Sequence, residues 1–142
     1  ICACLVGSEM CIRDRSQKLF EDGHYANAAE NAFVEINDRV KKLFMKVNPT
    51  ASKIPDGHTA MNMVFSDNAP LVEFCDRSTE TGSNIQKGYM QMLAGAMSAL
   101  RNPKAHANIT ITKDDAMRRL MFASMLMYKI DEAIDYSKIQ ER

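Results

Sequence analysis

The sequence predicts an all-α protein, an antiparallel up-and-down bundle of three long and several short helices. Apolar residues recur at alternating steps of three and four over three long stretches, which is the spacing of one buried helical face. The chain has only 6 Gly, no Trp and 11 Met, a composition that favours helices over strands and tight turns. No apolar run approaches the roughly 20 residues that span a bilayer, so no membrane partner is expected.

Length and charge limit the other classes of protein. The 142 residues are enough for one domain with its own core. The 18 basic and 18 acidic residues cancel, so any contact with nucleic acid must come from a local patch. After residue 15 the only cysteine is Cys75. We interpret it as a small buried apolar residue in a protein of the reducing cytoplasm.

Residues 1–15 have no helical or strand period that continues into the residues after them, and they hold Cys2, Cys4 and Cys11. These cysteines lack the paired spacing of zinc sites. The basic residues follow the apolar ones, which is the reverse of a secretory signal. The segment resembles translated sequencing-library adapter. We therefore expect a non-native prefix over residues 1–15 and a single helical domain over residues 16–142.

The first predicted helix starts with Ser16 as N-cap and stops at Gly23. A long helix then opens at His24 and Tyr25 and runs to about Val47. Its apolar residues step by 4, 3, 4, 3 and 4, and form one buried stripe: Ala29, Phe33, Ile36, Val40, Leu43 and Val47.

The middle third is less regular. Asn48 and Pro49 end the long helix, and a loop continues to Gly57. Residues 59–65 suggest a two-turn helix. Residues 71–75 are a short apolar segment whose secondary structure the sequence leaves open. We expect residues 76–83 to form a loop.

The second long helix is expected over residues 84–100, with its buried residues at Met90, Leu93, Met97 and Leu100. A short extended link over residues 108–111 follows. Thr112 then caps the last helix, with Asp115 three residues on, close to a capping box. This helix runs to about Tyr136, and its apolar stripe is Ala116, Leu120, Ala123, Met127, Ile130 and Ile134.

The break between these two helices carries the candidate chemistry. Pro103 ends the helical path, so Arg101 and His106 can turn toward one pocket, which a continuous helix would not allow. A guanidinium beside an imidazole that titrates near neutrality suits a site that handles phosphate. The alternative is a helix break whose two charged residues simply face solvent.

The other histidines and the methionines favour plainer interpretations. His24 lies where the chain enters the long helix, and His58 lacks enough neighbours for a metal site. Most methionines lie on or beside the apolar stripes, where they fill gaps in a core. If the last two long helices pack antiparallel, five cations would form a phosphate-binding patch: Lys87, Lys104, Lys113, Arg118 and Arg119.

A wider pattern runs through the chain in the same order. It includes Gly23-His24-Tyr25, Asp56-Gly57, Gly88-Tyr89 and Arg101-Asn102-Pro103-x-Ala105-His106. Over about residues 17–135 the chain resembles the Ymh-type conserved hypothetical family, and its Arg-x4-His motif resembles that of the HEPN superfamily. This resemblance implies a HEPN-like helical bundle that forms a homodimer. In active members it implies a metal-independent endoribonuclease whose active residues would here be Arg101, Asn102 and His106.

The chemistry of such a site needs two copies of the chain. Cleavage by the 2′-hydroxyl requires a base, an acid and a cation for the crowded phosphate, and one histidine supplies one proton-transfer role. Two copies of the 101–106 turn would supply both, without a metal or other cofactor. We therefore expect a dimeric RNase of prokaryotic defence or toxin–antitoxin type, with RNA and an antitoxin or other protein as partners. The alternative is a non-catalytic helical module that dimerises or binds a partner protein.

Overall fold

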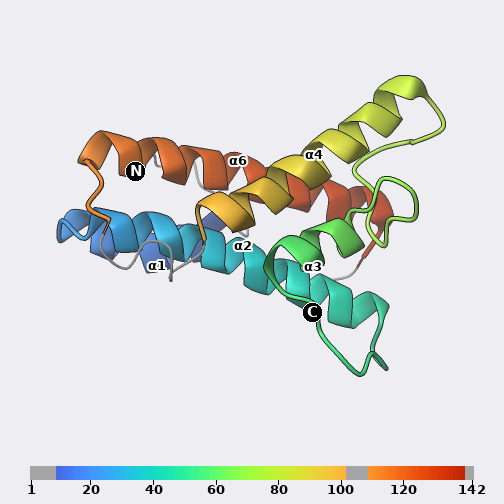
Figure 1. The fold of residues 1–142 in the computed structure, drawn as a ribbon, viewed down its shortest axis with the longest axis horizontal. Helices are drawn as coiled ribbons and strands as arrows, with labels where there is room; N and C mark the ends of the chain where they lie inside the picture. The colour runs from blue at the N-terminus through green and yellow to red at the C-terminus, as the bar shows by residue number, and fades with distance from the viewer. Residues whose placement is uncertain (1–8, 102–108, 140–142) are drawn as a thin grey trace.

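The computed structural model describes residues 9–101 and 109–139, and all regular secondary structure in these two ranges is helical, as predicted. The helices are α1 (Glu9–Glu21), α2 (Tyr25–Val47), α3 (Gly57–Val64), α4 (Glu80–Ala99) and α6 (Lys113–Ser137). They pack as a helical bundle (Figure 1).

Helix α2 is the centre of the bundle, and it contacts α1, α3 and α6. Helix α4 packs mainly on α3 and crosses α6 diagonally (Figure 1). Lys129 of α6 lies over the ring of Tyr89 of α4, so the two helices meet there. The stripe predicted on α6 is buried throughout, and the stripe on α2 is buried except for Val47, which is 39% exposed near the helix end. On α4, Leu93 and Met97 are buried as predicted, whereas Met90 and Leu100 are partly buried. The apolar spacing therefore identified most of the core.

The prediction of Ser16 as an N-cap is wrong. Helix α1 begins at Glu9, so Ser16 lies inside it and is only 1% exposed. Its small side chain is packed in the interior, and Arg15 beside it forms an ion pair with Glu35 of α2 at 2.5 Å. The predicted stop at Gly23 is confirmed, because Gly23 has φ +82 and the next amide, that of His24, donates to the Leu19 carbonyl. The division into a prefix and a domain remains a prediction.

Helix α4 begins at Glu80, inside the segment predicted as a loop. The Thr79 hydroxyl accepts a hydrogen bond from the Gly82 amide at 3.0 Å and caps the helix. A Cβ on Gly82 would lie 1.8 Å from the Asp76 carbonyl oxygen, so the turn before α4 needs glycine there. The cap predicted for α6 is confirmed, since Thr112 accepts from the Asp115 amide at 3.1 Å.

The segment between α3 and α4 is a series of bends and turns, and it is held by one buried side chain. Gln86 of α4 accepts from the Phe74 amide at 2.9 Å and donates to the carbonyls of Phe65 and Val72. Val72 and Phe74 fill the buried positions of this segment, and Cys75 is half-buried and not buried as predicted. Desolvation raises the pKa of the Cys75 thiol.

Candidate functional site

Arg101 follows Leu100, the C-cap of α4, and its side chain reaches Asp56, the residue that precedes α3. Its Nη1 donates to Asp56 Oδ2 at 2.8 Å, and its Nη2 lies 3.5 Å from Asp56 Oδ1. The pair thus approaches the two-pronged arrangement that guanidinium and carboxylate groups favour. The Arg101 side chain is 25% exposed, so solvent still reaches one side of the cation.

Two residues in the middle of α2 complete the cluster. Asn37 is buried; it donates to Asp56 Oδ1 at 3.0 Å and accepts from the Gly57 amide at 2.8 Å. Lys41, one turn further along α2, brings its Nζ to 3.2 Å from Asp56 Oδ1. The cluster therefore joins α2, the start of α3 and the end of α4, and two cations around one carboxylate leave one net positive charge.

The start of α3 is shaped for this arrangement. Asp56 occupies the N-cap position, but its side chain makes no capping bond because it faces Arg101, Asn37 and Lys41. Gly57 has φ +55, and a Cβ there would lie 3.0 Å from Arg101 Nη1. Glycine favours that backbone conformation and lets the guanidinium approach closely.

The Asp56 carboxyl of the cluster is ionised at neutral pH. The hydrogen bond from Arg101, followed by that from Asn37, holds the pKa of the Asp56 carboxyl well below its usual range. Asp56 is therefore an ionised anchor at neutral pH, unsuited to proton transfer. Arg101 Nε is buried and has no hydrogen-bond partner among the described residues, so the guanidinium keeps unused donor capacity.

Replacing Asp56 with Asn should lower the free energy of unfolding at pH 7 by about 1 kcal/mol, a modest value because the carboxylate is half-exposed. The folded-state pKa is depressed, so the contribution is present above the unfolded value near 3.8 and is lost as the pH falls through the folded pKa. Urea denaturation of both proteins should thus show a constant difference down to about pH 4 and a shrinking one below it.

Asp135→Asn is the matched control, because Asp135 is exposed at the far end of α6. Removing a negative charge near a helix C-terminus should leave stability unchanged or slightly raise it. If Asp56→Asn matches this control at every pH, Asp56 does not anchor the cluster.

The predicted phosphate-binding cations are not all gathered at Arg101. Lys113 Nζ lies 5.9 Å from the centre of the Phe20 ring of α1, and residues 109–111 line a groove with residues 23–27. Tyr25 and Asn37 are twelve residues apart on α2, so this end of the bundle is about 18 Å along the helix from the Arg101 cluster.

The remaining predicted residues divide into three groups. Lys87 and Arg118 are exposed. Arg119 pairs with Asp115 at 3.0 Å, one turn away on α6. Asn102, Lys104 and His106 lie outside the described residues. The side-by-side packing of α4 and α6 that would surround Arg101 with these cations is replaced by a crossing near Tyr89 (Figure 1).

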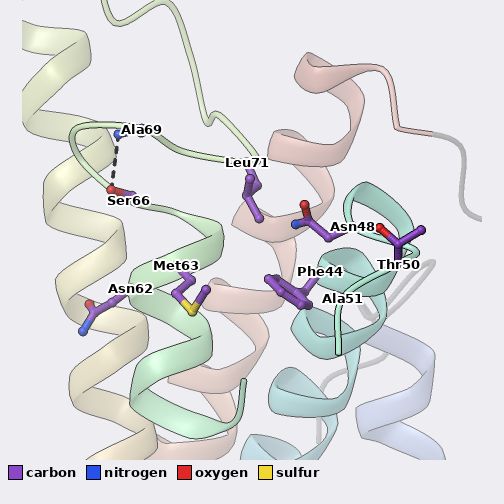
Figure 2. Close-up of a pocket in the computed structure, with 9 residues that line it drawn as sticks. All are labelled: Phe44, Asn48, Thr50, Ala51, Asn62, Met63, Ser66, Ala69 and Leu71. Atoms are coloured by element: carbon purple, nitrogen blue, oxygen red, sulfur yellow. Dashed lines mark hydrogen bonds between the residues drawn. The ribbon is translucent and has the colours of Figure 1, made fainter. Parts of the chain in front are cut away.

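A concave region lies near the C-terminal end of α3. A groove of about 520 Å³ runs between the end of α2, α3 and the loop before residue 71 (Figure 2). Its lining residues are Phe44, Asn48, Thr50, Ala51, Asn62, Met63, Ser66, Ala69 and Leu71. None of these side chains titrates, so the groove lacks the groups that acid–base chemistry requires.

The other histidines do not join the cluster. His24 is exposed before α2, and the ring of the exposed His58 lies 3.1 Å from the amide nitrogen of Asn62 on the next turn of α3. Within residues 9–101 and 109–139, no three His, Cys, Asp or Glu side chains gather closely enough to hold a metal. None of the helices described there is long and apolar enough to span a membrane.

Comparison with known families gives one match. A model of the family described as "Protein of unknown function (Hypoth_ymh)" matches residues 7–130. The chain belongs to the Hypoth_ymh family. No curated protein and no solved structure matches it. The predicted resemblance to the Ymh-type family is therefore confirmed, while membership of the HEPN superfamily remains a prediction.

The Hypoth_ymh match contains the whole Arg101 cluster and His106. The sequence pattern included Asp56-Gly57 and Arg101, but it did not predict that Asp56 and Arg101 form an ion pair. Asn37 and Lys41 were missed altogether. Asn37 could have been found from its position, because it is a polar residue next to Ile36 of the apolar stripe. A polar side chain at such a buried position needs hydrogen-bond partners.

Proposed function

We propose that this protein is a metal-independent endoribonuclease of HEPN type that acts as a homodimer, with Arg101, Asn102 and His106 as its active residues. The observation that carries the proposal is the partly exposed Arg101 guanidinium, which is held on Asp56 and lies five positions before His106 in the sequence. A preorganised guanidinium is suited to a phosphate that gains charge during the reaction.

The proposed reaction is transfer of the phosphodiester to the neighbouring 2′-oxygen. His106 of one copy accepts the proton of the 2′-hydroxyl, and that oxygen forms the new bond to phosphorus. The bond from phosphorus to the 5′-oxygen breaks, and His106 of the second copy donates a proton to the leaving oxygen. The products are a 2′,3′-cyclic phosphate and a 5′-hydroxyl.

Arg101 would stabilise the charge on the phosphate in the transition state. Asp56, which Asn37 holds in place, fixes the guanidinium on one side. The Arg101 side chain is 25% exposed, so a phosphate can approach the guanidinium from the solvent side. Lys41 adds a second positive charge at the same place. The exposed Lys87 and Arg118, together with Lys104, Lys113 and Arg119, are proposed to contact the RNA backbone further from the reacting phosphate.

The test is RNA cleavage in excess EDTA by the full chain and by His106→Ala. Loss of one proton-transfer group should reduce the rate by about 10²- to 10⁴-fold. His24→Ala is the control, because His24 is exposed at the start of α2, and it should cleave at the wild-type rate. Equal cleavage by wild type and His106→Ala, or none by the wild type on varied RNA, would refute the proposal.

A non-catalytic role in binding a partner protein, such as an antitoxin, is the second candidate. One observation favours it, an exposed row on α6 formed by Met121, Met125 and Tyr128, which are 66%, 41% and 54% exposed. Exposed apolar rows of this kind commonly contact other proteins. Absence of cleavage by the wild type on every RNA would favour this role.

A further inference from the structure

The outward side of α4 is an apolar face of unusual regularity. Its residues step by 4, 3, 4, 3 and 4 along the helix: Thr81, Ile85, Gly88, Met92, Gly95 and Ala99. Ile85 is 38% and Met92 is 36% exposed, although both are apolar. This spacing is that of a seam between two helices, and it lies on the side of α4 opposite the buried Leu93 and Met97.

Charge is nearly absent from α4. Among its 20 residues only Glu80 and Lys87 are charged, and neither belongs to the outward face. The 25 residues of α6 include nine charged ones, as expected for a helix with one side in water. An exposed helix face without charges is typical of a protein–protein interface.

The face also has room for a close neighbour. A Cβ added at Gly88 or Gly95 would meet no heavy atom within 4 Å among the described residues. At Gly88 the missing side chain leaves a shallow groove of about 370 Å³, bordered by Ile85 and Met92. A side chain of comparable size could enter this groove, and at either glycine two helix backbones could approach closely.

The geometry points to a two-fold interface in which α4 of one copy packs on α4 of a second copy of this chain, crossing near Gly95. The regular steps of three and four are self-complementary, because the same row on a two-fold-related helix offers matching projections and gaps. The occupant is thus a second copy of the chain, and a different protein would need a matching row of its own.

The position of the crossing rests on the proposed function, which needs two histidines in one cleft. Arg101 lies six residues beyond Gly95, about 9 Å along the helix, and sixteen residues beyond Ile85, about 24 Å. Crossing near Gly95 therefore keeps the separation of the two Arg101 residues along the helix axes small, whereas crossing near Ile85 increases it. The absence of a side chain at Gly95 permits the crossing at the nearer place.

The test is sedimentation velocity of the full chain over a range of concentrations, without RNA. The wild type should be a dimer. Gly95→Arg should weaken dimerisation at least 100-fold, and Met92→Lys should weaken it by a similar factor. Replacing an exposed helical glycine favours the monomeric helix, so the helical circular dichroism and Tm of Gly95→Arg at low concentration should not fall.

Ser83→Arg is the matched control. Ser83 is exposed on α4 but lies nine residues from Met92, about half a turn away, so this variant should remain a dimer. A wild type that is monomeric at all concentrations, or a Gly95→Arg variant that dimerises like the wild type, would overturn the interface.

RNA cleavage, measured separately, distinguishes this inference from the proposed function. If the wild type forms a dimer that Gly95→Arg disrupts, but the wild type cleaves no RNA, the result would support the α4 interface and contradict the nuclease. A monomeric Gly95→Arg that cleaves at the wild-type rate would contradict the inference that this interface supplies the second histidine.

Discussion

Arg101→Lys is expected to reduce RNA cleavage by about 10²- to 10³-fold, the usual loss when a donor to the transition state is removed. Lysine keeps the charge, but its ammonium cannot pair with Asp56 through two nitrogens and still present further donors in a fixed plane. The measurement is kcat/KM of the full chain in excess EDTA, with circular dichroism to confirm that helical content is unchanged.

Arg77→Lys is the matched control for that substitution. Arg77 donates to the carbonyls of Asp67 and Asn68 and pairs with Glu73, so it holds a loop outside the Arg101 cluster. Its replacement should alter stability and leave the cleavage rate of the folded protein within about twofold. If Arg101→Lys cleaves RNA as fast as the control, the guanidinium has no role in the reaction.

Gln86→Leu should lower the free energy of unfolding by at least about 3 kcal/mol. Leucine would fit the volume, but it would leave the Phe74 amide and the carbonyls of Phe65 and Val72 buried without partners, at about 1–3 kcal/mol each. A loss of this size is a large part of the stability of a small domain. Urea denaturation followed by circular dichroism measures it.

Gln91→Leu provides the comparison on the same helix. Gln91 is exposed, so its replacement should change the free energy of unfolding by less than about 0.5 kcal/mol. A loss below about 1 kcal/mol for Gln86→Leu would show that the segment over residues 65–74 does not depend on this side chain.

The sequence was most informative about the core of the long helices. The apolar stripes of α2 and α6 were predicted from spacing alone. Each helix buries one side, so its buried residues recur with the helical period of 3.6 residues. The Thr112 cap was also predictable, because its partner is the Asp115 amide three residues away. Local patterns determine these features, so one sequence is enough to find them.

Features that depend on distant partners were not predictable. Gln86 bonds to residues 12 to 21 positions away, and Arg101 pairs with Asp56 at a separation of 45. The start of α1 was missed for a related reason. Ser16 has a residue type that favours N-caps, but tertiary packing buries it inside a longer helix.

The candidate site shows the same division. Arg101 was identified from a helix break and a short motif in the sequence. The residues that hold it, Asn37, Lys41 and Asp56, come from α2 and the start of α3 and meet only in the folded chain. Family membership adds that this cluster and His106 belong to one matched stretch, residues 7–130.

The most direct test of the proposed nuclease is to identify the RNA ends that the full chain produces in excess EDTA. Mass spectrometry of cleaved oligoribonucleotides should find 2′,3′-cyclic phosphate and 5′-hydroxyl ends, and an RNA whose 2′-hydroxyls are methylated should stay intact. Products with a 5′-phosphate, or cleavage of the methylated RNA at the same rate, would contradict attack by the 2′-hydroxyl and with it the roles proposed for Arg101 and His106.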